Sequence, residues 1–352
     1  MTAAGRHVLV VRLDSLGDVL LAGPAVRAVA AAAGRVTFLA SRRGRAAAEL
    51  LPGVDEVVVA DVPWIDPEPE PVDRAAMLEL VDRIAGRRVD QAVILTSFHQ
   101  SALPTALLLR MAGVPVVAAV SEDYPGSLLD IRHRVPDDMH EVHRALSTVG
   151  TLGYELPAGD VGALAVKVPS PDALGAAPVV VHPGASVPAR TWAPDRYAAV
   201  VAALVATGRR VVVTGAPDER ELTAFVAGPD RSGVTDLGGL VDFAGLARVL
   251  AGAAAVVVGN TGPAHLAAAV GTPVVSLFAP TVPAARWRPW GVPHVVLGDQ
   301  DIPCAGCRAR TCPIPGHPCL GRVPVEAVVA AVEQLAPRGV RRAGGLRSAV
   351  GQ

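Results

Sequence analysis

One turn in the second half of the chain combines an apolar run with groups that could bind an anion. Residues 256–258 are consecutive valines, residues 259–262 read Gly-Asn-Thr-Gly, and an Ala- and Leu-rich segment containing His265 follows. Such a turn presents free backbone N–H groups and a helix N-terminus at the carboxyl end of a buried strand, where α/β proteins bind phosphate. Pro263 suits the first helical turn, where a missing N–H costs nothing. Taken alone, the turn is equally typical of a phosphate site and of an ordinary strand-to-helix connection.

Two more polar loops in this half follow strand-like runs. Residues 184–190 come after the apolar run 179–182, and residues 215–219 come after the run 210–214. Parallel strands bring such loops to one edge of a sheet, so we expect them to face the same cleft as residues 260–265. Small residues that admit a diphosphate, one arginine and one acid indicate a nucleotide site there. Its candidate residues are Gly184, Ala185, Ser186, Arg190, Gly215, Glu219, Asn260, Thr261, Gly262 and His265.

A polar corner also follows the first apolar run of the N-terminal half. Residues 12–18 read Arg-Leu-Asp-Ser-Leu-Gly-Asp, directly after the run 8–11. Gly17 permits a tight corner, and Asp18 falls where a helix is expected to begin. The helix dipole favours an acid at that position, so Asp18 is either a chemical group or an ordinary helix cap. Asp14, which precedes the corner, is the other carboxylate nearby.

The elements that must position these loops alternate along the chain. Short β-branched runs are separated by segments of helical length, which predicts parallel β-α-β units and a doubly wound sheet in each half. The predicted strands are residues 8–11, 36–40, 57–59, 93–95, 116–120, 179–182, 210–214, 256–258 and 274–278. The predicted helices are residues 19–33, 45–51, one ending at 84, one ending at 111, 195–207, 246–252 and 263–270, and residues 63–71 form a Pro-rich acidic loop.

The length of the chain fits two α/β domains of ordinary size. A chain of 352 residues exceeds one average domain. We predict an N-terminal Rossmann-like domain over residues 1–168, a C-terminal one over 172–335, a linker around 168–171 and a tail over 336–352. Two such domains leave a cleft between them, which is a natural place to join two substrates.

Composition excludes several classes of protein. Apolar residues make up 51% of the chain and aromatic residues only 3%, so alanine, valine and leucine must fill the cores. A net charge of −1 argues against a nucleic-acid partner. Residues 249–283 lack charged side chains, but turns with glycine and proline divide them, as in a buried strand-helix-strand unit. The N-terminus carries no secretory signal, so we predict a cytoplasmic protein with at most peripheral contact at the inner membrane face.

In their order, these motifs resemble glycosyltransferase family 9, the ADP-heptose:lipopolysaccharide heptosyltransferase family. The matching segments are residues 12–24, 182–192, 215–219, 246–265 and the cysteine segment 304–320. Together they run across nearly the whole chain. The resemblance implies a GT-B fold, with the acceptor in the N-terminal domain and the nucleotide sugar in the C-terminal one. It also implies an inverting transfer that needs neither a metal nor a cofactor.

The resemblance further implies roles for particular residues. Asp18 is the base that deprotonates the acceptor hydroxyl, and Arg190 helps to neutralise the leaving diphosphate. Glu219 lies near the nucleotide ribose, and the segment from Thr261 to His265 holds phosphate. Val241 joins the donor-binding residues, and the residues on the acceptor side are Gly17, Arg42, Arg43 and His99.

Two positions depart from the family pattern. Many heptosyltransferases carry lysine where this chain has Arg190, and an acid where it has Asn260. Arginine still supplies charge and can bind a diphosphate with two parallel hydrogen bonds. The loss of the acid leaves the donor sugar open between heptose and a related sugar, with ADP favoured as the nucleotide. The acceptor is a hydroxyl of a glycan, a glycolipid or a secondary metabolite.

The four cysteines form a separate motif. Cys304, Cys307, Cys312 and Cys319 lie in one Pro- and Gly-rich segment, and a CxxC pair followed by two further cysteines is typical of a small zinc site. A cytosolic chain is not expected to carry a disulfide framework. Because the resembled family is not associated with a required metal, we predict structural thiols. Structural zinc is the first alternative and a redox function the second.

Three other functions compete with a transferase. Nucleotide-sugar 2-epimerases share the two-domain architecture, but they need no acceptor. A non-catalytic nucleotide-sugar binder would not need to retain Asp18 and Arg190. A dinucleotide-dependent oxidoreductase is the weakest alternative, because no G-x-G-x-x-G motif follows the first predicted strand.

Overall fold

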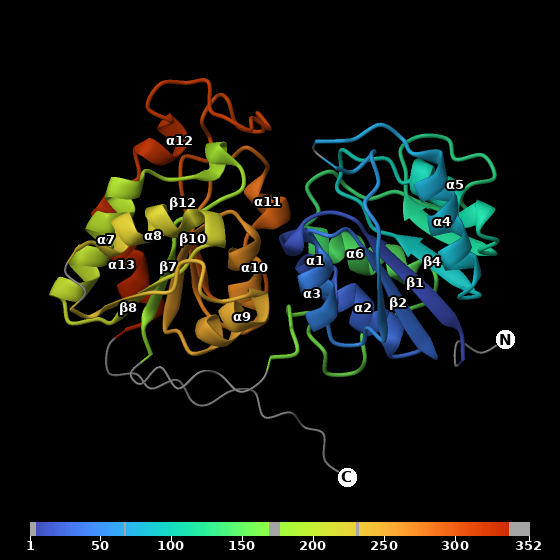
Figure 1. The fold of residues 1–352 in the computed structure, drawn as a ribbon, viewed down its shortest axis with the longest axis horizontal. Coiled ribbons are helices and arrows are strands. Elements are labelled where there is room, and N and C mark those ends of the chain that lie inside the picture. The colour runs from blue at the N-terminus through green and yellow to red at the C-terminus, as the bar shows by residue number, and fades with distance from the viewer. Residues whose placement is uncertain (1–4, 67, 169–176, 230–231, 338–352) are drawn as a thin grey trace, which may run out of the picture.

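Two parallel six-stranded sheets with helices on both faces make up the protein (Figure 1). The computed structural model describes residues 5–66, 68–168, 177–229 and 232–337. All ten strand pairs are parallel. The prediction of an α/β protein with two doubly wound sheets is therefore confirmed.

The first sheet has the strand order β3-β2-β1-β4-β5-β6. Its strands are β1 (His7–Arg12), β2 (Arg35–Ala40), β3 (Glu56–Val59), β4 (Gln91–Ile94), β5 (Val116–Val120) and β6 (Ile131–His133). The helices of this half are α1 (Leu16–Leu21), α2 (Gly23–Ala30), α3 (Arg45–Leu50), α4 (Arg74–Ala85), α5 (Leu103–Met111) and α6 (Glu141–Gly150).

The second sheet has the equivalent order, β12-β11-β10-β7-β8-β9. Its strands are β7 (Val179–His182), β8 (Val211–Val213), β9 (Val234–Asp236), β10 (Ala255–Gly259), β11 (Val274–Leu277) and β12 (His294–Leu297). Its helices are η1 (Pro188–Arg190), α7 (Pro194–Ala206), η2 (Pro217–Glu219), α8 (Arg220–Ala227), α9 (Phe243–Ala251), α10 (Gly262–Ala269), α11 (Ala284–Trp287), α12 (Pro318–Gly321) and α13 (Val325–Leu335).

In both sheets the strand order reverses at one place, between β1 and β4 and between β7 and β10. Parallel α/β sheets bind ligands outside the carboxyl ends of the strands at such a switch point, because the helices on either side leave in opposite directions there. The fold therefore offers two equivalent binding crevices, one in each half.

The side chains of β1 alternate between two cores. Val8 and Val10 pack with α1, α2, α3 and α6, whereas Leu9 and Val11 pack with α4 and α5. Strand β10 divides its valines in the same way, one face joining α9 and α10 and the other joining α7 and α13. Because the first of these cores contains residues of both halves, the two sheets are held together by a shared apolar layer.

The halves meet closely where α1 packs against α10. A Cβ atom on Gly17 would lie 2.9 Å from Cδ2 of His265 and 3.4 Å from Cα of Gly262. The first of these distances is too short for a real contact, so a side chain at residue 17 would displace the His265 ring or separate the two helices. The limits predicted for the two domains remain a prediction. The linker residues 169–171 and nearly all of the tail lie outside the described residues.

One predicted helix is wrong in its extent. Residues 19–33 were expected to form a single helix, but α1 ends at Leu21 and α2 begins at Gly23. Pro24 lies in the first turn of α2, and a helix cannot run through it because proline lacks the N–H and its ring clashes with the carbonyl four residues earlier. The strands β6, β9 and β12 were missed. β6 and β9 are edge strands of three residues with a weak apolar pattern, whereas β12 is an edge strand whose apolar run was overlooked.

The charge-free segment 249–283 contributes to α9, β10, α10 and β11. In the part of the chain that the structure describes, no helix combines the length and apolar character needed to span a membrane.

Candidate active site

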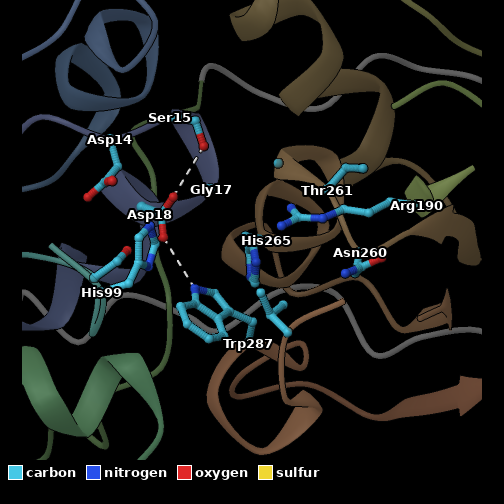
Figure 2. Close-up of a pocket in the computed structure, with 13 residues that line it drawn as sticks. Asp14, Ser15, Gly17, Asp18, His99, Arg190, Asn260, Thr261, His265 and Trp287 are labelled. Atoms are coloured by element: carbon cyan, nitrogen blue, oxygen red, sulfur yellow. Dashed lines mark hydrogen bonds between the residues drawn. The ribbon is translucent and has the colours of Figure 1, made fainter. Parts of the chain in front are cut away.

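A cavity of about 130 Å³ lies between the two sheets and is lined by both halves of the chain (Figure 2). Its lining residues follow the carboxyl ends of β1, β4, β7, β10 and β11, which include all four strands at the two switch points. They are Asp14, Ser15, Gly17, Asp18, Ser97, His99, Arg190, Asn260, Thr261, Gly262, His265, Val282 and Trp287. The two crevices that the topology offers therefore open into one site.

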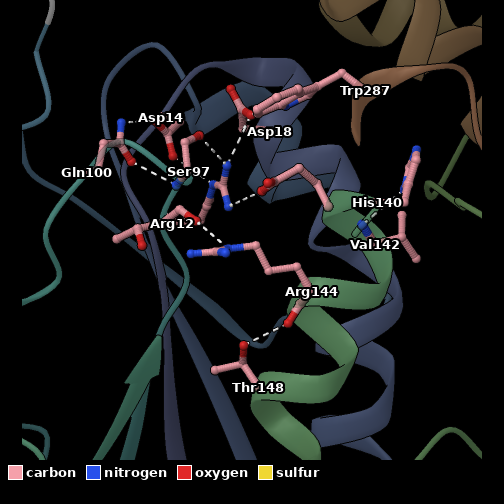
Figure 3. Close-up of polar contacts among 12 residues, drawn as sticks. Arg12, Asp14, Asp18, Ser97, Gln100, His140, Val142, Arg144, Thr148 and Trp287 are labelled. Carbon is pink, nitrogen blue, oxygen red and sulfur yellow. Dashed lines mark hydrogen bonds and ion pairs between the residues drawn. The ribbon is translucent and has the colours of Figure 1, made fainter. Parts of the chain in front are cut away.

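Arg12, the last residue of β1, is the centre of charge on the N-terminal side (Figure 3). The residue is 2% exposed. Its Nε lies 2.7 Å from Oδ2 of Asp14, and its Nη1 donates to Oε2 of Glu141 at 3.3 Å. Its Nη2 donates to Oδ1 of Asp18 at 3.0 Å and to Oγ of Ser97 at 2.9 Å. One guanidinium thus joins three carboxylates that come from the corner after β1 and from α6.

The pKa values of these three carboxylates shift in different directions. Burial raises the pKa of Asp14 although Arg12 opposes the rise, and burial also raises the pKa of Glu141. Burial would raise the pKa of Asp18 as well, but the Arg12 charge and the indole N–H of Trp287 lower the pKa below its usual value. Asp18 is therefore the carboxylate whose ionised form this site favours most.

Asp18 faces the cavity with a side chain that is 19% exposed. Its Oδ1 accepts hydrogen bonds from Arg12 and, at 3.2 Å, from Nε1 of Trp287, while its Oδ2 accepts one from Oγ of Ser15 at 3.2 Å (Figure 2). Ser15 occupies the N-cap position of α1. Among the hydrogen bonds of the described residues, none runs from a backbone N–H to the Asp18 carboxylate. These contacts do not support a helix-capping role for Asp18.

Arg190 brings a positive charge to the opposite wall. It ends the short helix η1, is half-buried, and its Nε donates to Oγ1 of Thr281 at 3.4 Å. Within the described residues, no carboxylate lies within ion-pair distance of it. Burial lowers the pKa of Arg190 and the charge of Asp18 raises it, but a guanidinium remains protonated in proteins. The site therefore holds a cation whose charge is not neutralised by a direct partner.

The N-terminus of α10 carries two buried polar atoms that lack a partner. Oγ1 of Thr261 and Nδ1 of His265 form no hydrogen bond with any described residue. Burial lowers the pKa of His265 to about 4, so its ring is neutral at physiological pH. Polar atoms left unpaired in this way are costly, and a helix N-terminus attracts anions. The arrangement suits a bound phosphate group.

Asn260 reaches the same wall but is tied to the framework. Its Nδ2 donates to the carbonyl oxygen of Ala279 at 3.3 Å, and its Oδ1 accepts from the N–H of Ala279 at 3.3 Å. The side chain therefore links the end of β10 to the segment after β11.

The loops after β7 and β8 pack on each other outside the cavity. A Cβ atom on Gly184 would lie 2.0 Å from Oε1 of Glu219, and Oε2 of Glu219 accepts from the N–H of Ala216 at 2.8 Å. Both loops lie at the same edge of the sheet as the cavity. The predicted donor-binding residues that do not line it are Gly184, Ala185, Ser186, Gly215, Glu219 and Val241.

The residues predicted on the acceptor side are divided between the cavity and its surroundings. Gly17 and His99 line it. Arg42 and Arg43 instead form ion pairs with partly exposed carboxylates, and the Arg42 side chain is 82% exposed. Their charges lie outside the cavity and are already paired.

Sequence reasoning missed several residues that build the site, among them Arg12, Ser15, Ser97, Glu141 and Trp287. Arg12 is the one arginine at the end of an apolar strand, and Trp287 is one of four tryptophans in a chain that is poor in aromatic residues. Either feature could have marked the residue. Ser97 and Glu141 carry no comparable signal, because an isolated serine or glutamate in a polar loop or helix is ordinary.

The cysteine segment forms a second, smaller cavity of about 20 Å³. It is lined by all four cysteines, Cys304, Cys307, Cys312 and Cys319, together with His317, and it borders Ala189 and Thr281 beside Arg190. All four thiols are free, and burial raises the pKa of Cys319. Within the described residues, no group of three or more His, Cys, Asp or Glu side chains is placed to hold a metal ion.

The fold and this cavity define a two-sheet α/β protein whose candidate site is lined by both halves of the chain. A family model described as glycosyltransferase family 9 (heptosyltransferase) matches residues 78–317. The chain belongs to glycosyltransferase family 9.

Individual relatives agree with this assignment. Lipopolysaccharide heptosyltransferase 3 of Escherichia coli is 34% identical over 165 residues, which cover 45% of this chain and 47% of that protein. The chain thus spans about half the length of this curated relative.

Solved structures extend the likeness in fold to nearly the whole chain. A family 9 glycosyltransferase from Veillonella parvula superposes with a TM-score of 0.76 at 18% identity, covering 96% of this chain and 98% of the other. E. coli heptosyltransferase WaaC with ADP gives a TM-score of 0.70 at 21% identity, covering 94% and 100%. The expected GT-B architecture is confirmed.

The Arg12 cluster gives a prediction about stability. Arg12→Leu should lower the free energy of unfolding by about 3–5 kcal/mol at neutral pH, because three carboxylates lose their shared buried partner. The loss should become smaller at mildly acidic pH, since protonation then removes charges that no longer have a counterion. Urea unfolding at the two pH values measures both effects.

Arg35→Leu is the matched control, because Arg35 pairs with Glu56 and is 56% exposed. It should change the free energy of unfolding by less than about 1 kcal/mol at either pH. If Arg12→Leu is no more destabilising than this control, the cluster does not stabilise the fold.

The cysteine segment gives a prediction about metal content. Purified protein should contain no stoichiometric zinc, and exhaustive chelation should leave its melting temperature unchanged, because the thiols are expected to act as packed side chains. Elemental analysis and a thermal melt before and after chelation check this. One zinc per chain that disappears in Cys304→Ser would establish the alternative, a structural metal site.

Proposed function

We propose that this chain transfers a heptose or a related sugar from an ADP-linked donor to a hydroxyl of a cell-envelope glycan or glycolipid. The transfer inverts the anomeric centre and needs no metal. One observation carries the proposal: an ionised carboxylate of the N-terminal half and an unpaired guanidinium of the C-terminal half line the same cavity. Membership of glycosyltransferase family 9 supports it.

The donor diphosphate is proposed to bind at the N-terminus of α10. Backbone N–H groups, the hydroxyl of Thr261 and the ring of His265 supply hydrogen bonds to the diphosphate. Because Oγ1 of Thr261 and Nδ1 of His265 have no hydrogen-bond partner among the described residues, both are available for this ligand. Arg190 adds positive charge. The neighbouring loops after β7 and β8 then bind the nucleoside, with Glu219 near the ribose. The ADP in the WaaC complex, a protein of the same fold, favours adenine as the base.

Asp18 is proposed as the general base. As the acceptor oxygen attacks the anomeric carbon, Oδ2 of Asp18 takes the hydroxyl proton and the bond from that carbon to the diphosphate oxygen breaks. The electron pair leaves with the nucleoside diphosphate, whose added charge Arg190 and the α10 N-terminus stabilise. Asp14 is a poorer base, because one of its oxygens faces Arg12 and the other accepts from Gln100.

This division of roles matches the predicted domains. Residues 1–168 would hold the acceptor, with Gly17 and His99 at the cavity and Arg42 and Arg43 farther out. Residues 172–335 would hold the donor. A reaction between the two bound substrates explains why both switch points open into one space.

Asp18→Asn tests the base directly. Transfer from ADP-heptose to a lipopolysaccharide-core acceptor should fall by at least about a hundredfold, because asparagine cannot accept the proton. ADP should still raise the melting temperature, since the donor site is intact. Asp14→Asn should be better tolerated. Substantial transfer by Asp18→Asn would contradict the assignment of Asp18 as the general base. Conversion of the donor without any acceptor would favour the epimerase alternative.

Arg190→Ala tests the stabilisation of the leaving group. The turnover number should drop by about a hundredfold or more, the usual effect of losing one preorganised charge, and Arg190→Lys should recover part of it. Arg196→Ala serves as the control, because Arg196 contacts the carbonyl of Val323 and does not line the cavity. Near-normal turnover of Arg190→Ala would leave Arg190 with a structural role only.

A further inference from the structure

We propose that Trp287 is a positioning residue for the general base: its indole N–H, contributed by the C-terminal half, fixes Asp18 in its reactive orientation when the two halves meet. The inference rests on the proposed function in one respect, the assignment of Asp18 as the base. It adds that the base is completed by the domain that holds the donor.

The contact itself crosses the cleft. Nε1 of Trp287, at the end of α11, donates to Oδ1 of Asp18 at 3.2 Å (Figure 2). The other two hydrogen bonds of this carboxylate come from Arg12 and Ser15, which belong to the N-terminal half. Among the described residues, Trp287 is the only one of the C-terminal half that donates to Asp18.

The two oxygens of the Asp18 carboxylate differ in how many hydrogen bonds they accept. Arg12 and Trp287 both donate to Oδ1, whereas Oδ2 accepts only from the hydroxyl of Ser15. A carboxylate oxygen can accept about two hydrogen bonds, so Oδ1 is saturated and Oδ2 retains capacity for the acceptor hydroxyl. Two donors from different directions also stop the carboxylate from rotating. Oδ2 is therefore the oxygen that would take the proton of the acceptor hydroxyl.

Trp287 is held in place by the N-terminal half. Its ring lies 5.6 Å from the ring of Phe98 at an interplanar angle of 55°. The guanidinium groups of Arg286 and Arg308 also lie over Phe98, at 4.1 and 4.4 Å from the ring centroid. Cation–π contacts of this kind favour the docked state. The segment around α11 thus rests on Phe98 in the same arrangement in which Trp287 donates to Asp18.

The same segment also forms two hydrogen bonds with the N-terminal half. Nε1 of Trp290 donates to the carbonyl oxygen of Gly162 at 3.0 Å, and Nε2 of His140 lies 3.0 Å from the carbonyl oxygen of Arg288. Neither reaches Asp18. Trp290 therefore matches Trp287 in residue type, in segment and in its bond across the halves, but not in its partner.

Several other charged or titratable groups face Asp18, and the experiment must hold them constant. They are Arg12 and Asp14 at the end of β1, Glu141 on α6, His99 after β4, Arg190 on η1 and His265 on α10. Burial raises the pKa of Asp18, while the Arg12 charge and then the Trp287 N–H lower it. Removing the indole N–H alone should therefore raise this pKa.

Trp287→Phe in the full chain removes the N–H and keeps an aromatic ring against Phe98. The acidic limb of the turnover number should move to higher pH. Because the pKa of Asp18 is lowered below the usual aspartate value of about 4, the profile is followed from below that pH up to about pH 7. Activity on that limb should fall by about tenfold or more relative to its plateau, the effect of losing one hydrogen bond to an ionised carboxylate. The plateau should also fall, and the shift in melting temperature caused by ADP should stay the same.

Trp290→Phe, the matched control, should leave the acidic limb where it is in the unsubstituted protein. A second measurement covers the case in which Trp287→Phe is too slow to assay. Carboxyl-carbon NMR of protein labelled at aspartate, assigned with Asp18→Asn, should show a higher pKa for Asp18 in Trp287→Phe than in Trp290→Phe.

Two results would overturn the inference. One is an acidic limb and an Asp18 titration that are the same in Trp287→Phe and in the unsubstituted protein. The other is an equal loss of stability and activity in both tryptophan variants with no change in the titration. If Asp18→Asn meanwhile abolishes transfer, the proposed function stands without this refinement. If Asp18→Asn retains transfer, the assignment of Asp18 as the base fails and this inference fails with it, while the transferase activity itself stands.

Discussion

The rest of the site depends on the placement of one buried positive charge, that of Arg12. A guanidinium that is 2% exposed needs carboxylate partners, and Arg12 has three of them. They come from the corner after β1 and from the N-terminus of α6, so the same interaction that neutralises the charge also joins these elements around the switch point. It also keeps the pKa of Asp18 low although burial alone would raise it. The same ion pairs therefore hold the framework together and favour the ionised form of Asp18, the proposed base.

The second constraint is the close contact of two sheets that have the same topology. Each sheet alone offers a crevice at its switch point, and neither crevice alone holds both the Asp18 carboxylate and Arg190, the cation without an ion-pair partner among the described residues. Gly17 allows α1 to approach α10 so closely that the crevices merge. The N-terminal half then supplies negative charge through Asp18, and the C-terminal half supplies positive charge through Arg190. This polarity agrees with a reaction in which a proton is lost on one side and a diphosphate leaves on the other.

How much of this could be predicted from the sequence depends on the range of each signal. The alternation of apolar runs and helical segments predicted both sheets, and the polar loops at strand ends predicted Asp18, Arg190 and the start of α10, all of which line the cavity. Local patterns could not show that Arg12 points inward. They also could not show that Trp287 contacts Asp18, because Asp18 and Trp287 lie 269 positions apart in the sequence. The single helix expected over residues 19–33 failed because its apolar pattern outweighed the effect of Pro24.

The departure at Asn260 has a physical explanation in the fold. Its amide donates to the carbonyl of Ala279 and accepts from the N–H of the same residue, which links β10 to the segment after β11. An acid at this position could only accept, and it would set a carboxylate oxygen against a carbonyl oxygen. With asparagine, both backbone groups are satisfied and the wall beside Arg190 carries no negative charge. A residue type that is unusual for the resembled family thus leaves the proposed diphosphate site more positive, because no carboxylate at this position opposes the charge of Arg190.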